Sequence, residues 1–205
     1  MAGFWEIYQY TYFDYQSPLK NFGTQFELEE LEWEACISLA TLPMRSLGLA
    51  YENDAIVEGM ISSVGQRANL IQKVCEHLIE NIAQTQKIIT QEDISKALKD
   101  SKLLELFQDW NQLSTEPKEQ WIDRVVLYST IEQNSFDDRD LQETIKKYTL
   151  NINSNELDKS LARLRLGYII KKENDGYSYR VPIFREWVLK NDIGARLESE
   201  VKYKG

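Results

Sequence analysis

Histidine and cysteine are scarce in this chain of 205 residues, which contains one histidine and two cysteines. The histidine, His77, has no clustered partners, so the sequence offers no metal site of the usual kind. It also lacks a serine or cysteine partner at a recognisable spacing, which argues against a catalytic base. Cys36 and Cys75 lie far apart among apolar residues, and we expect both to be buried in a reducing cytoplasm. We therefore predict neither catalytic nor metal-binding residues.

Long apolar runs are also missing. No stretch reaches the roughly 18 apolar residues that a membrane span needs, and the segment Met1–Glu6 has no positive charge before an apolar core, so we expect no secretory signal. The formal net charge of −9 argues against broad adhesion to nucleic acid or to an anionic membrane, but leaves room for a local basic face. With 42% hydrophobic residues, the sequence predicts a globular cytoplasmic protein with no membrane partner.

Aromatic residues, in contrast, crowd the first 29 residues. Seven of them fall within twelve positions: Phe4, Trp5, Tyr8, Tyr10, Tyr12, Phe13 and Tyr15. Thr24–Leu28 then alternates as a short strand does. One strand cannot form a sheet alone, so residues 1–29 are predicted to be the edge of something larger. Few basic residues accompany these rings, so packing against protein is favoured over stacking on bases.

Residues 30–114 have helical periodicity and are predicted to form a helical bundle. The first helix is expected to bury Leu31, Ala35, Leu39 and Leu42 and to end at Pro43. A second is expected over residues 53–62, and Gly65 marks the turn after it. The third carries the widest apolar stripe: Leu70, Ile71, Val74, Cys75, Leu78, Ile79 and Ile82. Thr90 with Asp93 has the form of a capping box for a short helix.

A different pattern follows the boundary at residues 114–117, where Pro117 suits the first turn of a new helix. Three helices are predicted, over residues 121–132, from Asp137 and from Asn153. A strand over residues 167–170, a turn over residues 174–176 and a returning strand over residues 177–181 predict a hairpin. A last helix should cover residues 182–190. This order predicts a winged helix-turn-helix with a two-stranded wing over residues 117–192, followed by a tail over residues 193–205.

Several of these segments together are similar to a known family. The order of Ser17–Gly23, Leu42–Gly48, Gly65–Cys75, Gly167–Ile170 and Tyr179–Trp187 resembles the C-terminal part of bacterial AAA-type ATPases of the signal-transduction class, the STAND NTPases. The resemblance covers nearly the whole chain and implies a mainly α protein. Residues 1–29 would be a remnant strand of the α/β ATPase core, residues 30–114 the helical lid, and residues 117–192 the winged helix.

The family binds ATP and magnesium, and its lid and winged helix close over the nucleotide. This chain departs from the family because it contains no Gly-x-x-x-x-Gly-Lys-Ser/Thr phosphate loop. We therefore expect no cofactor in this chain. The resemblance implies instead an ATPase core domain as partner, in cis or in trans, and residues 1–28 could support self-association through their strand edge.

The resemblance and the predicted winged helix suggest two sets of site residues. Gly65 and Arg67 open the third helix, where AAA-type lids often carry an arginine that reaches phosphates; the family usually has proline in place of Ala68. An ordinary first-turn surface arginine is the alternative. For nucleic acid, the expected residues are those on the outward face of the helix from Asn153 and those leading into the wing: Lys159, Arg163, Lys171 and Lys172.

Three hypotheses remain open at this point. The first is a regulatory interaction module, the lid and winged helix of a STAND-like ATPase. The second is a DNA-binding regulator that uses its winged helix, although acids such as Glu156 and Asp158 share the same helix and weaken its field. The third is a partner that completes an ATP site in trans, with Arg67 as its contribution.

Overall fold

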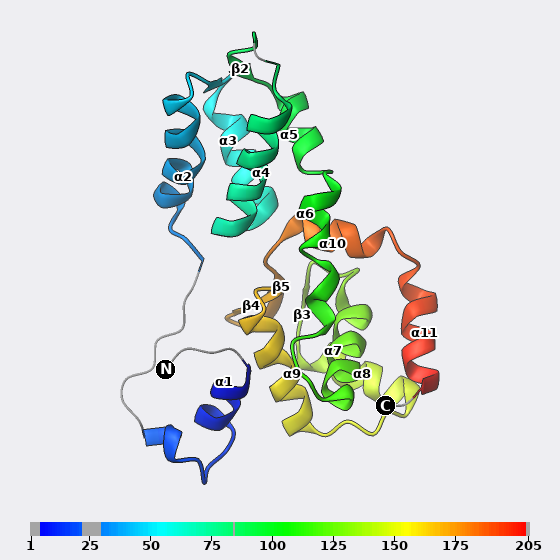
Figure 1. Cartoon of the computed structure of the whole chain (residues 1–205). Helices are drawn as coiled ribbons and strands as arrows, with labels where there is room; N and C mark the ends of the chain where they lie inside the picture. Colours follow the sequence, from blue (N-terminus) through cyan, green and yellow to red (C-terminus); the bar gives the residue numbers. More distant parts are fainter. Residues whose placement is uncertain (1–4, 22–29, 84, 204–205) are drawn as a thin grey trace. The chain divides into compact units, whose positions relative to one another are not determined.

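The computed structural model describes residues 5–21, 30–83 and 85–203, and it is mainly helical with two small sheets. The strand predicted at Thr24–Leu28 lies outside the described residues. The chain divides into two compact units (Figure 1). The first contains residues 1–26, 109–180 and 185–205, and the second contains residues 27–108 and 181–184. Among the described residues, no helix combines the length and the apolar character that a membrane crossing requires.

The second unit is a helical bundle with a minimal sheet. Its helices are α2 (Trp33–Ser46), α3 (Asp54–Val64), α4 (Ala68–Asn81), α5 (Gln91–Ala97) and α6 (Ser101–Glu105). Its strands, β1 (Ala50–Tyr51) and β2 (Ile88–Ile89), pair in parallel, with Ala50 opposite Ile88. The α4 helix buries most of the predicted stripe, including Leu70 and Val74, whereas Ile79 is 41% exposed. Met60 of α3 is buried as well.

Local capping chemistry fixes where these helices begin and end. Asn53 caps α3 by accepting from the backbone N–H of Ile56, and Gly65 ends that helix in the left-handed conformation, with φ 63°. Thr90 and Asp93 form the predicted capping box at the start of α5. The capping box at Thr90 and the turn at Gly65 are as predicted, whereas α3 runs to Val64, beyond the predicted end at residue 62.

The α2 helix corrects two predictions. It continues through Pro43 to Ser46, because a proline in the last turn removes one backbone hydrogen bond without preventing the helical φ. The buried face consists of Cys36, Ala40 and Met44, whereas Leu42 is 58% exposed. The predicted buried face, at Leu31, Ala35, Leu39 and Leu42, was wrong. Apolar residues recur at helical spacing on more than one side of α2, so the spacing alone does not select the buried side.

The first unit centres on α7 (Pro117–Thr130). Its other helices are α1 (Trp5–Tyr12), α8 (Asp138–Tyr148), α9 (Ser154–Leu166) and α11 (Ile193–Tyr203), with the 3-10 turn η1 (Pro18–Asn21). The 3-10 turn η2 (Gln108–Asn111) and the helix α10 (Pro182–Leu189) each contain residues of both units. Its sheet is antiparallel in the order β3-β5-β4, from β3 (Ser135–Phe136), β4 (Ile170–Glu173) and β5 (Gly176–Tyr179). The predicted hairpin is present, but its first strand begins at Ile170, where the predicted strand over residues 167–170 ended, and a third strand, β3, joins it.

Capping again sets the helix starts in this unit. Pro117 occupies the first turn of α7, and Asp137 and Asn153 each make a capping box, at α8 and α9. At the hairpin, a Cβ on Gly176 would collide with the backbone carbonyl of Phe136, so the close approach of β3 and β5 requires glycine there.

The described part of the predicted C-terminal tail is instead the helix α11, which packs on α7. The indole N–H of Trp121 donates to the backbone carbonyl of Glu200 at 2.9 Å, and Arg124 Nε donates to the Glu200 carboxylate at 2.7 Å. Ile193, Leu197 and Val201 recur every fourth residue, which is the helical spacing that the tail assignment overlooked.

Candidate functional site: a buried ion cluster between α7 and α9

A charged pair is buried where α7 and α9 pack together. Arg163 from α9 and Asp123 from α7 both have side chains with 0% exposure. Arg163 Nη2 lies 2.8 Å from Asp123 Oδ1, and Arg163 Nε lies 2.9 Å from Asp123 Oδ2, so the guanidinium grips the carboxylate with two bonds. The hydroxyl of Ser160 donates to Asp123 Oδ1 at 2.6 Å. Every oxygen of this buried carboxylate therefore has a donor.

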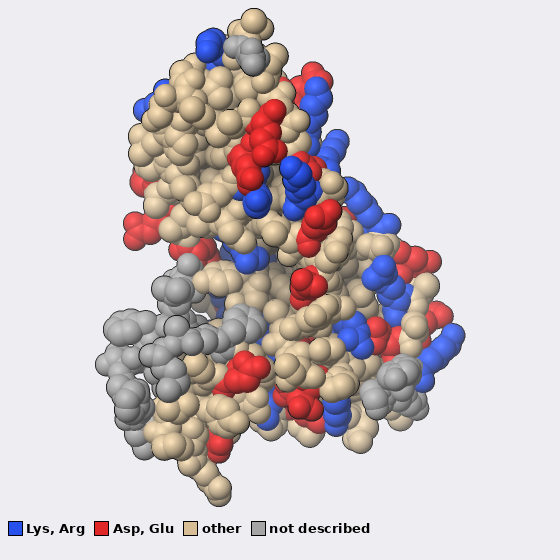
Figure 2. Space-filling view, in the orientation of Figure 1, with Lys and Arg blue, Asp and Glu red and all other residues tan. Residues whose placement is uncertain are grey.

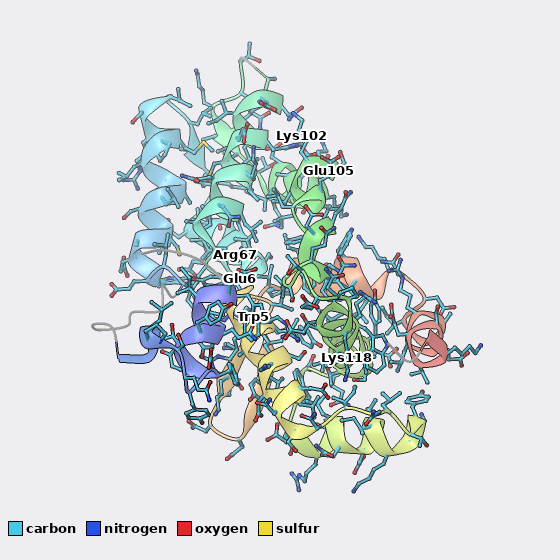
Figure 3. All side chains as sticks on the ribbon, turned by 60° about the horizontal axis from the view of Figure 1, so that its bottom comes forward. Trp5, Glu6, Arg67, Lys102, Glu105 and Lys118 are labelled. Carbon is cyan, nitrogen blue, oxygen red and sulfur yellow. The ribbon has the colours of Figure 1, made fainter. Side chains whose placement is uncertain are left out.

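Glu119, one turn before Asp123, links this pair to the N-terminal helix. Its Oε2 lies 3.0 Å from Arg163 Nη1 and accepts the Ser114 hydroxyl at 2.6 Å. The same oxygen accepts the indole N–H of Trp5 at 2.9 Å. Trp5, which is labelled in Figure 3, is 2% exposed. Its ring lies 4.7 Å from the Arg163 guanidinium carbon, as a cation–π contact does. Trp5 thus seals the cluster from solvent.

The electrostatics of the cluster are those of a structural ion pair. Burial raises the pKa of the Asp123 carboxyl, and the hydrogen bonds from Arg163 and Ser160 oppose that rise. The Arg163 guanidinium supplies the compensating charge, so the pair is neutral as a whole. The hydroxyls of Ser160 and Ser114 are buried and donate to the two carboxylates, so the arrangement serves to hold α1, α7 and α9 together.

This geometry corrects the prediction for the outward face of α9. Arg163 was expected to face solvent and phosphates, but it is fully buried. Lys159 is half-buried, with its Nζ 5.9 Å from the centre of the Phe13 ring. Leu157, Leu161 and Leu164 on the same helix are also buried. The buried face of α9 is wider than its leucines alone indicate. It includes Arg163, because Asp123, 40 residues earlier in the chain, supplies a buried partner for the guanidinium.

The two wing lysines are exposed but surrounded by carboxylates. Lys171 Nζ lies 3.2 Å from Glu173. Lys172 lines a shallow hollow of about 360 Å³ between the start of α8 and the hairpin. That hollow is also lined by Asp137, Asp138, Arg139, Asn174, Asp175, Gly176 and Tyr177. Figure 2 shows basic and acidic side chains interspersed on the face in view, without a continuous basic patch. Phosphate binding at the wing is correspondingly disfavoured.

Gly65 and Arg67 lie in the other unit, at the junction of α3 and α4. Gly65 forms the turn, and Gln66 also has a positive φ of 56°. Arg67 occupies the N-cap position of α4, makes no side-chain cap to that helix, and is half-buried (Figure 3). Its place at a helix start agrees with the sequence, whereas its role toward a nucleotide stays a prediction.

His77 is engaged in a structural pair. Its Nδ1 meets the carboxylate of Asp100, which also caps α6 by accepting the backbone N–H of Lys102 at 2.8 Å. The Lys102 N–H and the His77 contact hold the pKa of Asp100 below its ordinary value. Cys36 and Cys75 are both buried free thiols, as predicted. Within the described residues, no group of three histidine, cysteine or acidic side chains could hold a metal ion.

The ion cluster was missed by reasoning from sequence, although a signal for it exists. Asp123 stands among the buried residues Trp121, Ile122, Val125 and Val126. A charge on an apolar helix face calls for a buried partner. The identity of that partner follows only from the packing of α7 on α9. The chain matches no protein-family model, no curated protein and no solved structure.

Proposed function

We propose that the chain is a regulatory interaction module corresponding to the helical lid and winged helix of a STAND-type signalling ATPase, and that it is not catalytic by itself. The order α7, β3, α8, α9, β4, β5, with an antiparallel sheet, supports a winged helix over residues 117–192. The helices α2 to α6 would be the lid, over residues 30–114. Because the chain contains no phosphate loop, an ATPase core in cis or in trans would supply the nucleotide site.

One observation carries the choice of a packing module over a DNA reader. In a helix-turn-helix, the second helix of the motif presents its side chains to the major groove. Here α9 is the second helix of the motif in chain order. The N-terminal aromatic residues cover part of α9, since the Trp5 ring packs on Arg163 and the Phe13 ring faces Lys159. The two α9 cations expected to meet phosphates are thereby engaged within the protein. The helix is better suited to protein contacts than to DNA.

Nucleotide binding tests the non-catalytic part of this proposal. We expect the full chain to show neither Mg-dependent ATP turnover nor tight ATP binding in calorimetry, because it has no lysine and backbone cradle for the phosphates. The matched variants are Arg67→Ala and Arg45→Ala, which remove one arginine each from the start of α4 and the end of α2.

ATP turnover that follows the chain through purification, and that Arg67→Ala abolishes while Arg45→Ala preserves, would contradict the proposal. Turnover that appears only when a phosphate-loop core protein is added, with the same dependence on Arg67, would favour a partner that completes an ATP site in trans.

A further inference from the structure

The helix α2 has an exposed apolar face opposite the face that packs in the second unit. The packed face is fully buried and consists of Cys36, Ala40 and Met44. On the opposite side Leu42 is 58% exposed, and Ser38 and Ala35, one and two turns before it, are exposed as well. The ten residues from 35 to 44 carry no charge, and the surface over α2 at the upper left of Figure 2 is largely uncharged. Residues of this kind at helical spacing form a seam along which one helix packs on another.

Two charges of opposite sign stand at the ends of this exposed face. Glu34 lies in the first turn of α2 and Arg45 in the last. They are 11 residues apart, which is about three helical turns or about 16 Å, so they lie on the same side of the helix. Both are exposed, and within the residues that the structure describes neither side chain forms an ion pair or a hydrogen bond. The face therefore has a negative end, an uncharged middle and a positive end.

We infer that the outer face of α2, the side formed by Ala35, Ser38 and Leu42, is an interface between two copies of this chain in which two α2 helices pack antiparallel. About a twofold axis through the middle of the helices, Glu34 of each copy meets Arg45 of the other, so the contact contains two ion pairs. A parallel pair would instead set like charges against each other. The antiparallel register also brings Leu42 close to Ser38 of the other copy, where the small side chain leaves room for the leucine. The opposed helix dipoles favour the same direction.

The gain on association comes from apolar surface that a single copy leaves in water. Leu42 contributes most, because more than half of it is exposed in one copy. The helix has 14 residues and is thus about 21 Å long, so the contact is small. We expect a Kd weaker than about 1 µM, as for other small, transient interfaces. The ion pairs set the direction of packing and are screened by salt.

Sedimentation equilibrium of the full-length chain, over a concentration series that reaches several hundred micromolar, tests the interface. The wild-type chain should pass from monomer towards dimer, and Leu42→Lys, which puts a charge in the middle of the face, should stay monomeric. Leu106→Lys is the matched control, because Leu106 is 45% exposed at the end of α6. Both substitutions place a cation near the C-terminal end of a helix, where it suits the helix dipole, so both variants should keep the circular dichroism of the wild type.

Exchange of the two end charges tests the antiparallel register. Glu34→Lys and Arg45→Glu each set like charges against each other twice in a homodimer, so we expect dimerisation about tenfold weaker for either variant alone. In an equimolar mixture of the two variants, opposite charges meet at both ends again. The mixture should therefore regain the affinity of the wild type.

The outcomes separate this interface from other routes to association. A wild-type chain that stays monomeric at the highest concentration overturns the inference. Dimerisation that Leu42→Lys leaves intact also overturns it, because another surface, such as the exposed N-terminal tyrosines, would then hold the copies together. Single charge variants that dimerise as well as the wild type contradict the antiparallel packing. Loss of the dimer in Leu42→Lys but not in Leu106→Lys, with recovery in the mixture of charge variants, supports the inference.

Discussion

The pair of Arg163 and Asp123 makes the sharpest prediction about stability. Both side chains are fully buried and joined by two guanidinium bonds. Arg163→Met leaves Asp123 buried with only the Ser160 hydroxyl as donor. Breaking a buried pair by removing one partner costs about 3–5 kcal/mol, whereas replacing both partners by apolar groups is often neutral or stabilising by about 1–4 kcal/mol. We therefore expect Arg163→Met alone to lower the free energy of unfolding strongly, and the double variant with Asp123→Leu to recover most of that loss.

Urea unfolding followed by tryptophan fluorescence measures these changes in the free energy of unfolding. Trp5, Trp110, Trp121 and Trp187 lie in the first unit and only Trp33 lies in the second, so the signal reports mainly on the unit that contains the pair. Arg139→Met is the matched control, because Arg139 is 89% exposed in its pair with Asp137 and should matter little. A loss of less than about 1 kcal/mol in Arg163→Met, or a double variant as unstable as the two single losses combined, would contradict a buried pair of this kind.

Two further predictions concern the caps and the thiols. The side chain of Arg139 and the backbone N–H groups of α8 hold the pKa of Asp137 below its ordinary value. Its carboxylate therefore stabilises the fold above the unfolded pKa of about 3.9, and the stabilisation is lost as the pH falls through the folded pKa. Asp137→Ala should thus lower the urea midpoint at neutral pH and converge with wild type in acid; an equal loss at both pH values would refute the cap. Burial raises the pKa of Cys36 and Cys75, so neither should react with a thiol reagent until the protein is unfolded, and rapid labelling of the native chain, scored by mass spectrometry, would show that the α2–α4 packing is wrong.

Local chemistry made much of the fold predictable. Asn53, Thr90, Asp137 and Asn153 each satisfy free N–H groups within three residues, so sequence alone locates the helix starts that they cap. The turn before Gly176 is equally local. Gly65 and Arg67 could be placed at the turn between two helices because a glycine in the left-handed conformation commonly ends a helix.

The remaining features depend on contacts that are distant in the sequence. The β1–β2 pairing joins Ala50 to Ile88, which no two-residue strand could predict. Whether Arg163 faces solvent depends on Asp123 and on Trp5, which lies far away in the chain. A basic residue on a helix therefore cannot be assigned to a phosphate or to a carboxylate until the helices around it are in place.

The central claim is that α9 makes protein contacts rather than reading DNA, and duplex binding tests it most directly. Fluorescence anisotropy with labelled random duplex at physiological salt should give a Kd no tighter than the roughly 10⁻⁴–10⁻⁶ M of nonspecific binding. Lys159→Ala on α9 and Lys146→Ala on α8 should change that affinity alike, because neither cation is a dedicated contact. A submicromolar complex that Lys159→Ala weakens and Lys146→Ala does not would contradict the account.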